Sequence, residues 1–198
     1  MVWLEVETKV KLDNSEVPKL REKILKIAKF EKKGKKVDDY FAIRRKIKSI
    51  YPKKAFRVRA TKNKFEVNFK KWLKKLWTDD IVVKQEFEFE LEGKEQVEDL
   101  LALFRDLGFR EWVRKTKWNE TYSWKKDHKL SIEINLVKHL GYFMELEYLC
   151  QREDVEKARS AIREVLKILG IKQEQIDNTG YTRMLWYKGM RDKRYFID

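Results

Sequence analysis

The segment LEVETKVKL, residues 4–12, decides the fold because its apolar and charged residues alternate. As a β-strand it has an apolar face and a second face that carries Glu5, Glu7, Lys9 and Lys11. In a single strand of a soluble sheet, such a charged face usually points toward water. The same division recurs along the chain, so the explanation has to cover the whole sheet.

The later strand-like runs also gather their charges on one face. The groups that share a face are Arg57 and Arg59; Glu66, Asn68 and Lys70; Lys84, Glu86, Glu88 and Glu90; Lys115 and Lys117; Glu133 and Asn135; and Glu145 and Glu147. The opposite faces carry Phe56, Val58, Phe65, Val67, Phe69, Phe87, Phe89, Ile132, Ile134, Met144 and Leu146. Nearly every strand is therefore divided in the same way.

Two architectures fit this division: an open sheet with its charged face in solvent, or a barrel with a charged lumen and helices covering its apolar outside. A solvent-facing sheet gains nothing from grouping acids and bases on separate strands. A polar lumen must balance opposite charges, because an unpaired buried charge costs several kcal/mol. We therefore predict an α+β fold, a closed antiparallel β-barrel of about eight strands with helices packed outside.

The composition points to a partner that carries negative charge. The chain has 198 residues, of which 40% are charged, and a formal net charge of +14. This excess predicts attraction to nucleic acid, acidic membrane surfaces or small phosphorylated molecules. The length favours a single domain, residues 1–198.

Cysteine use and hydropathy exclude other classes of protein. With Cys150 as its one cysteine, the chain cannot form an intramolecular disulfide or a thiolate zinc cluster. No stretch approaches the roughly 18 consecutive apolar residues that a membrane helix needs. We expect a soluble, cytoplasmic protein with no membrane partner.

Helices are expected near residues 14–34, 93–108 and 153–170. The first would be capped by Asn14 or Ser15 and would end near Gly34. Residues 55–61 and 64–70 have the spacing of a hairpin, and residues 180–188 are expected to form a last strand.

Other segments are expected to serve packing or solubility. The lysine-rich runs at 29–36 and 44–54 are interpreted as solvated loops, and residues 71–80 fit no single element. The tryptophans that could stack on a base are interpreted as packing between barrel and helices; they are Trp112, Trp118, Trp124 and Trp186.

The charged faces have the chemistry of a metal and phosphate site. Carboxylates at i and i+2 of a strand lie about 6.6 Å apart, and with a facing strand they can coordinate Mg²⁺ or Mn²⁺. Arginine and lysine rows match phosphate oxygens, and acids beside bases are the groups used in phosphoryl transfer. We predict that Glu5 and Glu7 hold metal and that Lys9 and Lys11 hold phosphate.

The order of these motifs resembles a known family. EVETKVK is similar to the ExExK signature of the CYTH superfamily, the triphosphate tunnel metalloenzymes. Further similar segments follow in the family's order: DDYF at 38–41, FRVR at 56–59, VNFK at 67–70, KQEFEFE at 84–90, KTKW at 115–118 and IEINLVKHLGYFMELE at 132–147. The resemblance spans residues 4 to about 188.

The resemblance implies an eight-stranded tunnel that uses Mg²⁺ or Mn²⁺. Its implied metal ligands are Glu5, Glu7, Glu145 and Glu147, assisted by Glu86 and Glu88. Its implied substrate-binding residues are Lys9, Lys11, Arg57, Arg59, Lys70, Lys84, Lys115 and Lys117, of which Lys9, Arg57, Lys70 and Lys117 are the catalytic candidates.

The chain departs from the family pattern at several of these positions. Lys84 and Lys117 stand where arginine is usual, which keeps the charge but loses the bidentate fork. Asn135 stands where aspartate is common. Where the family usually has a lysine followed by a glycine, this chain has Lys70 followed by Lys71.

Three functions remain open. The first is a metal-dependent triphosphatase acting on inorganic tripolyphosphate or a small organic or nucleoside triphosphate. The second is a class IV adenylyl cyclase that converts ATP to cyclic AMP and pyrophosphate. The third is a basic module that binds polyphosphate or nucleic acid without turnover, although nucleic acid is not the favoured partner. A monomer or a homodimer is expected.

Overall fold

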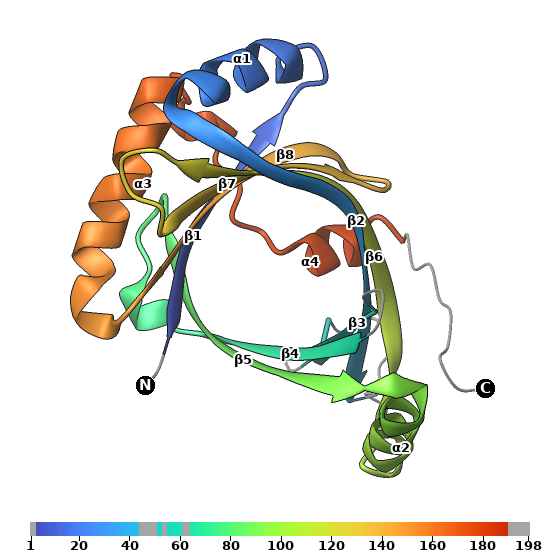
Figure 1. The fold of residues 1–198 in the computed structure, drawn as a ribbon. Coiled ribbons are helices and arrows are strands. Elements are labelled where there is room, and N and C mark those ends of the chain that lie inside the picture. The colour runs from blue at the N-terminus through green and yellow to red at the C-terminus, as the bar shows by residue number, and fades with distance from the viewer. Residues whose placement is uncertain (1–2, 44–50, 53–54, 61–63, 190–198) are drawn as a thin grey trace. The chain divides into compact units, whose positions relative to one another are not determined.

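The computed structural model describes residues 3–43, 51–52, 55–60 and 64–189, and these form a closed antiparallel barrel. Its eight strands are β1 (Leu4–Leu12), β2 (Ala28–Ile43), β3 (Ala55–Ala60), β4 (Lys64–Trp72), β5 (Val82–Glu92), β6 (Phe109–Trp124), β7 (Leu130–Val137) and β8 (Gly141–Cys150). Their hydrogen-bonded order is β1-β5-β4-β3-β2-β6-β7-β8 (Figure 1). The predicted fold class is confirmed, including the β3–β4 hairpin.

Helices and short 3₁₀ turns lie between the strands or after the last strand in the sequence. The α-helices of the described residues are α1 (Val17–Ile27), α2 (Gly93–Asp106), α3 (Val155–Leu169) and α4 (Tyr181–Tyr187), with short 3₁₀ turns at Lys74–Leu76, Arg152–Asp154 and Gln173–Gln175. None of these helices has the length and apolar content needed to span a membrane.

The chain divides into two compact units. The first comprises residues 1–35, 71–86 and 117–178. In it, α1 and α3 pack against β1, β7 and β8 (Figure 1). Ile24 of α1, Ile162 of α3 and Val6 of β1 are all fully buried in this core. The apolar face of the opening strand therefore points toward helices, and its charged face points the other way.

The second unit comprises residues 36–70, 87–116 and 179–198. Its core joins α2 to β2, β3 and β4 through buried side chains that include Val97, Leu101 and Val58. The rings of Phe56 and Phe104 lie 4.6 Å apart between centroids. Each unit thus has its own apolar core.

The first helix is shorter than predicted, and the lysine-rich run after it is not a loop. The helix ends at Ile27, and residues 29–36 belong to β2. Pairing with neighbouring strands, together with an edge-to-face contact between Phe30 and Tyr122, gives this charged run an extended conformation that its sequence does not encode. The helix also begins after Glu16 rather than Asn14 or Ser15, with no side-chain cap.

Two further expectations were wrong. The predicted last strand is helix α4, because Tyr181 and Leu185 are both buried and stand four residues apart on one helical face. Phe69, Phe87 and Phe89 are exposed rather than covered. The run at 44–54 lies outside the described residues except for Tyr51 and Pro52.

The burial on α3 gives a test of this core. Ile162 is fully buried, whereas Ile168 on the same helix is 47% exposed. We expect Ile162→Ala to lower the free energy of unfolding by about 3 kcal/mol, because the deletion leaves a cavity. Ile168→Ala, the matched control, should change it by less than about 0.5 kcal/mol. Urea denaturation of both variants measures the difference, and equal losses would contradict this packing.

Candidate active site

Three carboxylates of the first unit converge on one point. Glu5, Glu7 and Glu147 each offer an oxygen, and these oxygens lie within 4.8 Å of one another. The strand register explains this, because Glu7 stands directly opposite Glu147 and Glu5 is two residues along the same face of β1. Oxygen donors from several carboxylates are what Mg²⁺ and Mn²⁺ prefer, so these residues fit such an ion.

Lys84 offsets part of the negative charge of this carboxylate group. It stands opposite Glu5 in the pairing of β1 with β5, and its side chain is buried. Its Nζ lies 3.5 Å from Glu5 Oε1 and also contacts Glu7 Oε1. The same ammonium lies 5.3 Å above the ring of Trp72. A predicted substrate-binding residue is thus part of the acidic group itself.

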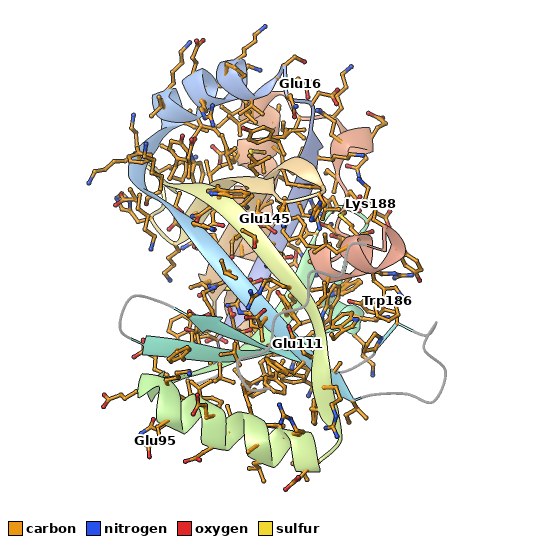
Figure 2. The ribbon with its side chains drawn as sticks, turned by 90° about the vertical axis from the view of Figure 1, so that its right-hand side faces the viewer. Glu16, Glu95, Glu111, Glu145, Trp186 and Lys188 are labelled. Atoms are coloured by element: carbon orange, nitrogen blue, oxygen red, sulfur yellow. The ribbon has the colours of Figure 1, made fainter. Side chains whose placement is uncertain are left out.

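A second polar group joins β6, β7 and β8. Lys117 Nζ lies 2.9 Å from Glu133 Oε2 and 3.2 Å from Glu145 Oε2. Asn135 Nδ2 donates to the same Glu145 oxygen at 2.7 Å. Figure 2 labels Glu145, whose side chain lies among others of this unit, whereas Glu16 lies at the outer end of α1. Glu145 is therefore held by a cation and an amide.

Lys9 is held in place through its backbone. The pairing of β1 with β5 covers Leu4 to Glu7, and beyond it residues 176–178 run along β1. Lys9 N donates to Asn178 Oδ1 at 2.8 Å, and Asp177 N donates to Lys9 O at 2.8 Å. Asn178 Nδ2 also donates to the Asp80 carbonyl at 3.0 Å. Sequence patterns did not identify Asn178, because this contact joins segments about 170 residues apart.

The environment of the Lys9 ammonium has opposing effects on its charge. Burial lowers the pKa of Lys9, and Glu145 and Glu7 oppose that effect. The net result is a pKa below the usual lysine value. Lys9 is thus a buried cation close to carboxylates of both polar groups.

Asp38 is the centre of a polar cluster in the second unit. Its Oδ1 lies 2.6 Å from Arg59 Nε, and its Oδ2 lies 2.8 Å from Lys115 Nζ and 3.8 Å from Arg57 Nη1. Burial would raise the pKa of Asp38, but Lys115, Arg57 and Arg59 bring it well below its usual range. Asp38 was not among the predicted site residues, although it lies in the DDYF motif that carries part of the family resemblance.

Glu66 and Glu88 of this unit also lie near the arginines. Arg57 Nη2 lies 2.6 Å from Glu66 Oε1, and Arg59 Nη1 lies 3.3 Å from the same atom. Glu88, a predicted metal ligand, is exposed and accepts a hydrogen bond from Asn68 at 3.1 Å. The predicted phosphate-binding arginines are therefore held by carboxylates from neighbouring strands.

The remaining predicted residues differ in burial. Lys70 on β4 and Glu86 on β5 are partly buried, and Lys11 at the end of β1 is exposed. Of the predicted metal ligands, Glu5, Glu7 and Glu147 are the three whose carboxylate oxygens lie together. The roles of the other predicted ligands stay predictions.

Comparison with known proteins now assigns the family. Residues 4–181 match the family model of the CYTH domain, so the chain belongs to the CYTH family. No curated protein sequence matches the chain.

Three solved structures illustrate the similarity. A conserved hypothetical protein from Pyrococcus furiosus has 25% identity and a TM-score of 0.69, over 90% of this chain and 98% of that chain. A candidate adenylyl cyclase from Hippeastrum, described as having a dominant triphosphatase activity, has 15% identity and a TM-score of 0.65, with 96% of each chain covered. The Mimivirus capping enzyme triphosphatase has 16% identity and a TM-score of 0.50, over 84% of this chain and 89% of that chain. The last two similarities show the fold alone.

The Asp38 cluster predicts a pH-dependent contribution to stability. The pKa of Asp38 is lowered on folding, so the ionised carboxylate stabilises the fold above its unfolded pKa of about 3.9. This contribution is lost as the pH falls through the lower, folded pKa. We expect Asp38→Asn to reduce the free energy of unfolding by about 3 kcal/mol at pH 7, because it leaves buried cations uncompensated.

Urea denaturation between pH 2 and 7 measures this effect. The difference between wild type and Asp38→Asn should narrow below about pH 4. Asp99→Asn, on the exposed side of α2, is the matched control and should follow the wild type. A difference that is the same at every pH would argue against charge as its cause.

Proposed function

We propose that this protein is a Mg²⁺- or Mn²⁺-dependent triphosphatase. Its substrate class is inorganic tripolyphosphate or a small organic or nucleoside triphosphate. The observation that carries the proposal is the convergence of Glu5, Glu7 and Glu147 within 4.8 Å, with the Lys84 ammonium against two of them. Membership of the CYTH family and the triphosphatases among the similar structures support it.

The acidic residues would hold the metal. Glu5, Glu7 and Glu147 form the ligand group, and Glu145, Glu86 and Glu88 are proposed to assist directly or through water. When bound, Mg²⁺ or Mn²⁺ would polarise phosphoryl oxygens and neutralise their charge. Lys84 offsets one of the three negative charges, and the two that remain match a divalent cation.

The basic residues would bind phosphate oxygens. Their proposed members are Lys9, Lys11, Arg57, Arg59, Lys70, Lys84, Lys115 and Lys117. Several already donate to a carboxylate, as Lys117 does to Glu133 and Glu145 and Arg57 does to Glu66. A phosphate oxygen would replace a carboxylate at such a cation, so the side chain needs little reorganisation.

In the proposed reaction, water attacks the terminal phosphorus, the bond from that phosphorus to its bridging oxygen breaks, and orthophosphate and the diphosphate leave. Lys9, Arg57, Lys70 and Lys117 are the proposed catalytic cations, which would stabilise charge as it develops on the transferred group. Because Lys9 is buried, its ammonium would act in a low-dielectric environment, where its interaction with phosphate is strengthened.

Product analysis separates this reaction from the two alternatives. Purified protein is incubated with ATP or tripolyphosphate and Mg²⁺ or Mn²⁺, and orthophosphate, pyrophosphate and cyclic AMP are resolved. Orthophosphate supports the triphosphatase. Cyclic AMP with pyrophosphate would instead assign a class IV adenylyl cyclase, in which the ribose 3′-hydroxyl attacks the α-phosphate. Binding of the triphosphate without formation of any product would instead support the basic module that binds without turnover.

Removing one ligand charge should abolish most turnover. We expect Glu7→Gln to lower kcat for tripolyphosphate by roughly 100-fold and to weaken Mn²⁺ binding measured by calorimetry, since an amide is a weaker ligand than a carboxylate. Glu5→Gln should behave in the same way.

Glu16→Gln is the control, because Glu16 is an exposed glutamate of the same unit. Circular dichroism confirms that the variants are folded. Full turnover and unchanged Mn²⁺ affinity in folded Glu7→Gln protein would exclude the proposed ligand role.

A further inference from the structure

We propose that the first unit has a second binding site, for a nucleobase that carries a phosphate, built on Trp118. A cavity of about 460 Å³ lies here, lined by residues that include Trp118, Lys33, Lys35 and Tyr142. Trp118 follows Lys117 in β6, so its side chain lies on the opposite face of the strand from the Lys117 ammonium. This site is therefore distinct from the carboxylate and lysine groups described above.

Trp118 has an accessible ring. Its side chain is 44% exposed, so the expectation that it packs between barrel and helices was wrong. By contrast, Trp124 further along β6 is only 4% exposed. The Nζ of Lys35 lies 5.8 Å from the Trp118 ring centroid, over its face. The indole ring is thus partly exposed, and a lysine ammonium is the group that now lies over its face.

The charge of the lining favours an anion. Arg21 of α1 makes two hydrogen bonds to Glu120, at 2.7 and 2.9 Å, and Tyr122 donates to the same carboxylate at 3.0 Å. The lining contains Arg21, Lys33 and Lys35 as cations and Glu120 as a carboxylate, which gives +2. Because Arg21 and Glu120 compensate each other, this net charge belongs to the two lysines.

The two lysines are placed to act together. Lys33 and Lys35 stand two residues apart on β2, so they share one face about 6.6 Å apart. Gly34 lies between them and also lines the cavity. Because lysine side chains are long and flexible, ammonium groups carried on backbone positions at this separation can both reach one phosphate.

These features select one ligand chemistry. A bare phosphate would use the lysines but not the indole, and an apolar group would use the indole but not the lysines. A nucleobase with a phosphate uses both. Base stacking on an aromatic ring is stronger than an exposed cation–π contact, so the base would displace the Lys35 ammonium toward the phosphate. The net charge of +14 attracts such anions to the chain.

The ligand could be a free nucleotide or one nucleotide of a single-stranded RNA, and two probes distinguish them. The full chain is titrated in EDTA with adenosine monophosphate by calorimetry, and with an unstructured ten-nucleotide RNA, bearing a 5′-hydroxyl and a 3′ dye, by fluorescence anisotropy. Both probes lack a triphosphate. Binding of both assigns the site to a single nucleotide, and binding of RNA alone assigns it to a strand.

We expect Trp118→Ala to weaken binding roughly tenfold and Trp118→Phe to retain most of it. Lys33→Gln and Lys35→Gln should each weaken binding and reduce the slope of log affinity against log salt by about one. Trp3→Ala and Lys19→Gln are the matched controls, since Trp3 is 52% exposed and Lys19 is exposed on α1.

Several results would overturn the proposal. These are the absence of binding by either probe, equal effects of Trp118→Ala and Trp3→Ala, and inorganic phosphate or an acidic peptide binding as tightly as the nucleotide. Turnover of tripolyphosphate gives an independent readout. Trp118→Ala should leave it unchanged, so a failure of this site is distinguishable from a failure of the proposed enzyme.

Discussion

Charge compensation among buried polar side chains is the constraint on which the barrel depends. Lys84 meets Glu5 and Glu7, Lys117 meets Glu133 and Glu145, and Asp38 meets basic residues of the second unit. Buried ion pairs of this kind contribute little net stability, because desolvation offsets most of the attraction, and apolar side chains of similar volume would often be at least as stable. Their presence in such number is what the proposed metal and phosphate site would require.

The strand register converts this constraint into a site. Glu7 stands opposite Glu147 and Glu5 stands opposite Lys84, and a shift of one residue would move these side chains to the helix-covered face. The β7–β8 connection helps to set the register: Leu140 N donates to Val137 O at 3.0 Å, and Gly141 has φ 95°, which favours glycine. The short turn thus helps to place Glu145 and Glu147 opposite Lys9 and Glu7 of β1.

Sequence patterns predicted most of the fold because the alternation of apolar and charged residues can be read within each strand by itself. The charged face that recurs from residues 4–12 through the later strands indicated a polar interior, and Glu5 and Glu7 followed from their spacing. The extended conformation of residues 29–36 was not predictable, because a lysine-rich run acquires it by pairing with distant strands. The role of Asp38 also depends on non-local pairing, since Arg59 stands opposite it only in the β2–β3 register.

Two residues at which the chain departs from the pattern of the resemblance, Lys117 and Asn135, contact the same carboxylate. Asn135 Nδ2 donates to Glu145 Oε2, and Lys117 contacts the same oxygen from β6. An aspartate at 135 would instead bring a second negative charge to this oxygen, which would repel Glu145. With an amide and a compact ammonium in place of a carboxylate and a guanidinium, Glu145 is held toward β6 and β7. Glu147 stands directly opposite Glu7 in the strand register, and it is therefore the β8 carboxylate whose oxygen lies with those of Glu5 and Glu7.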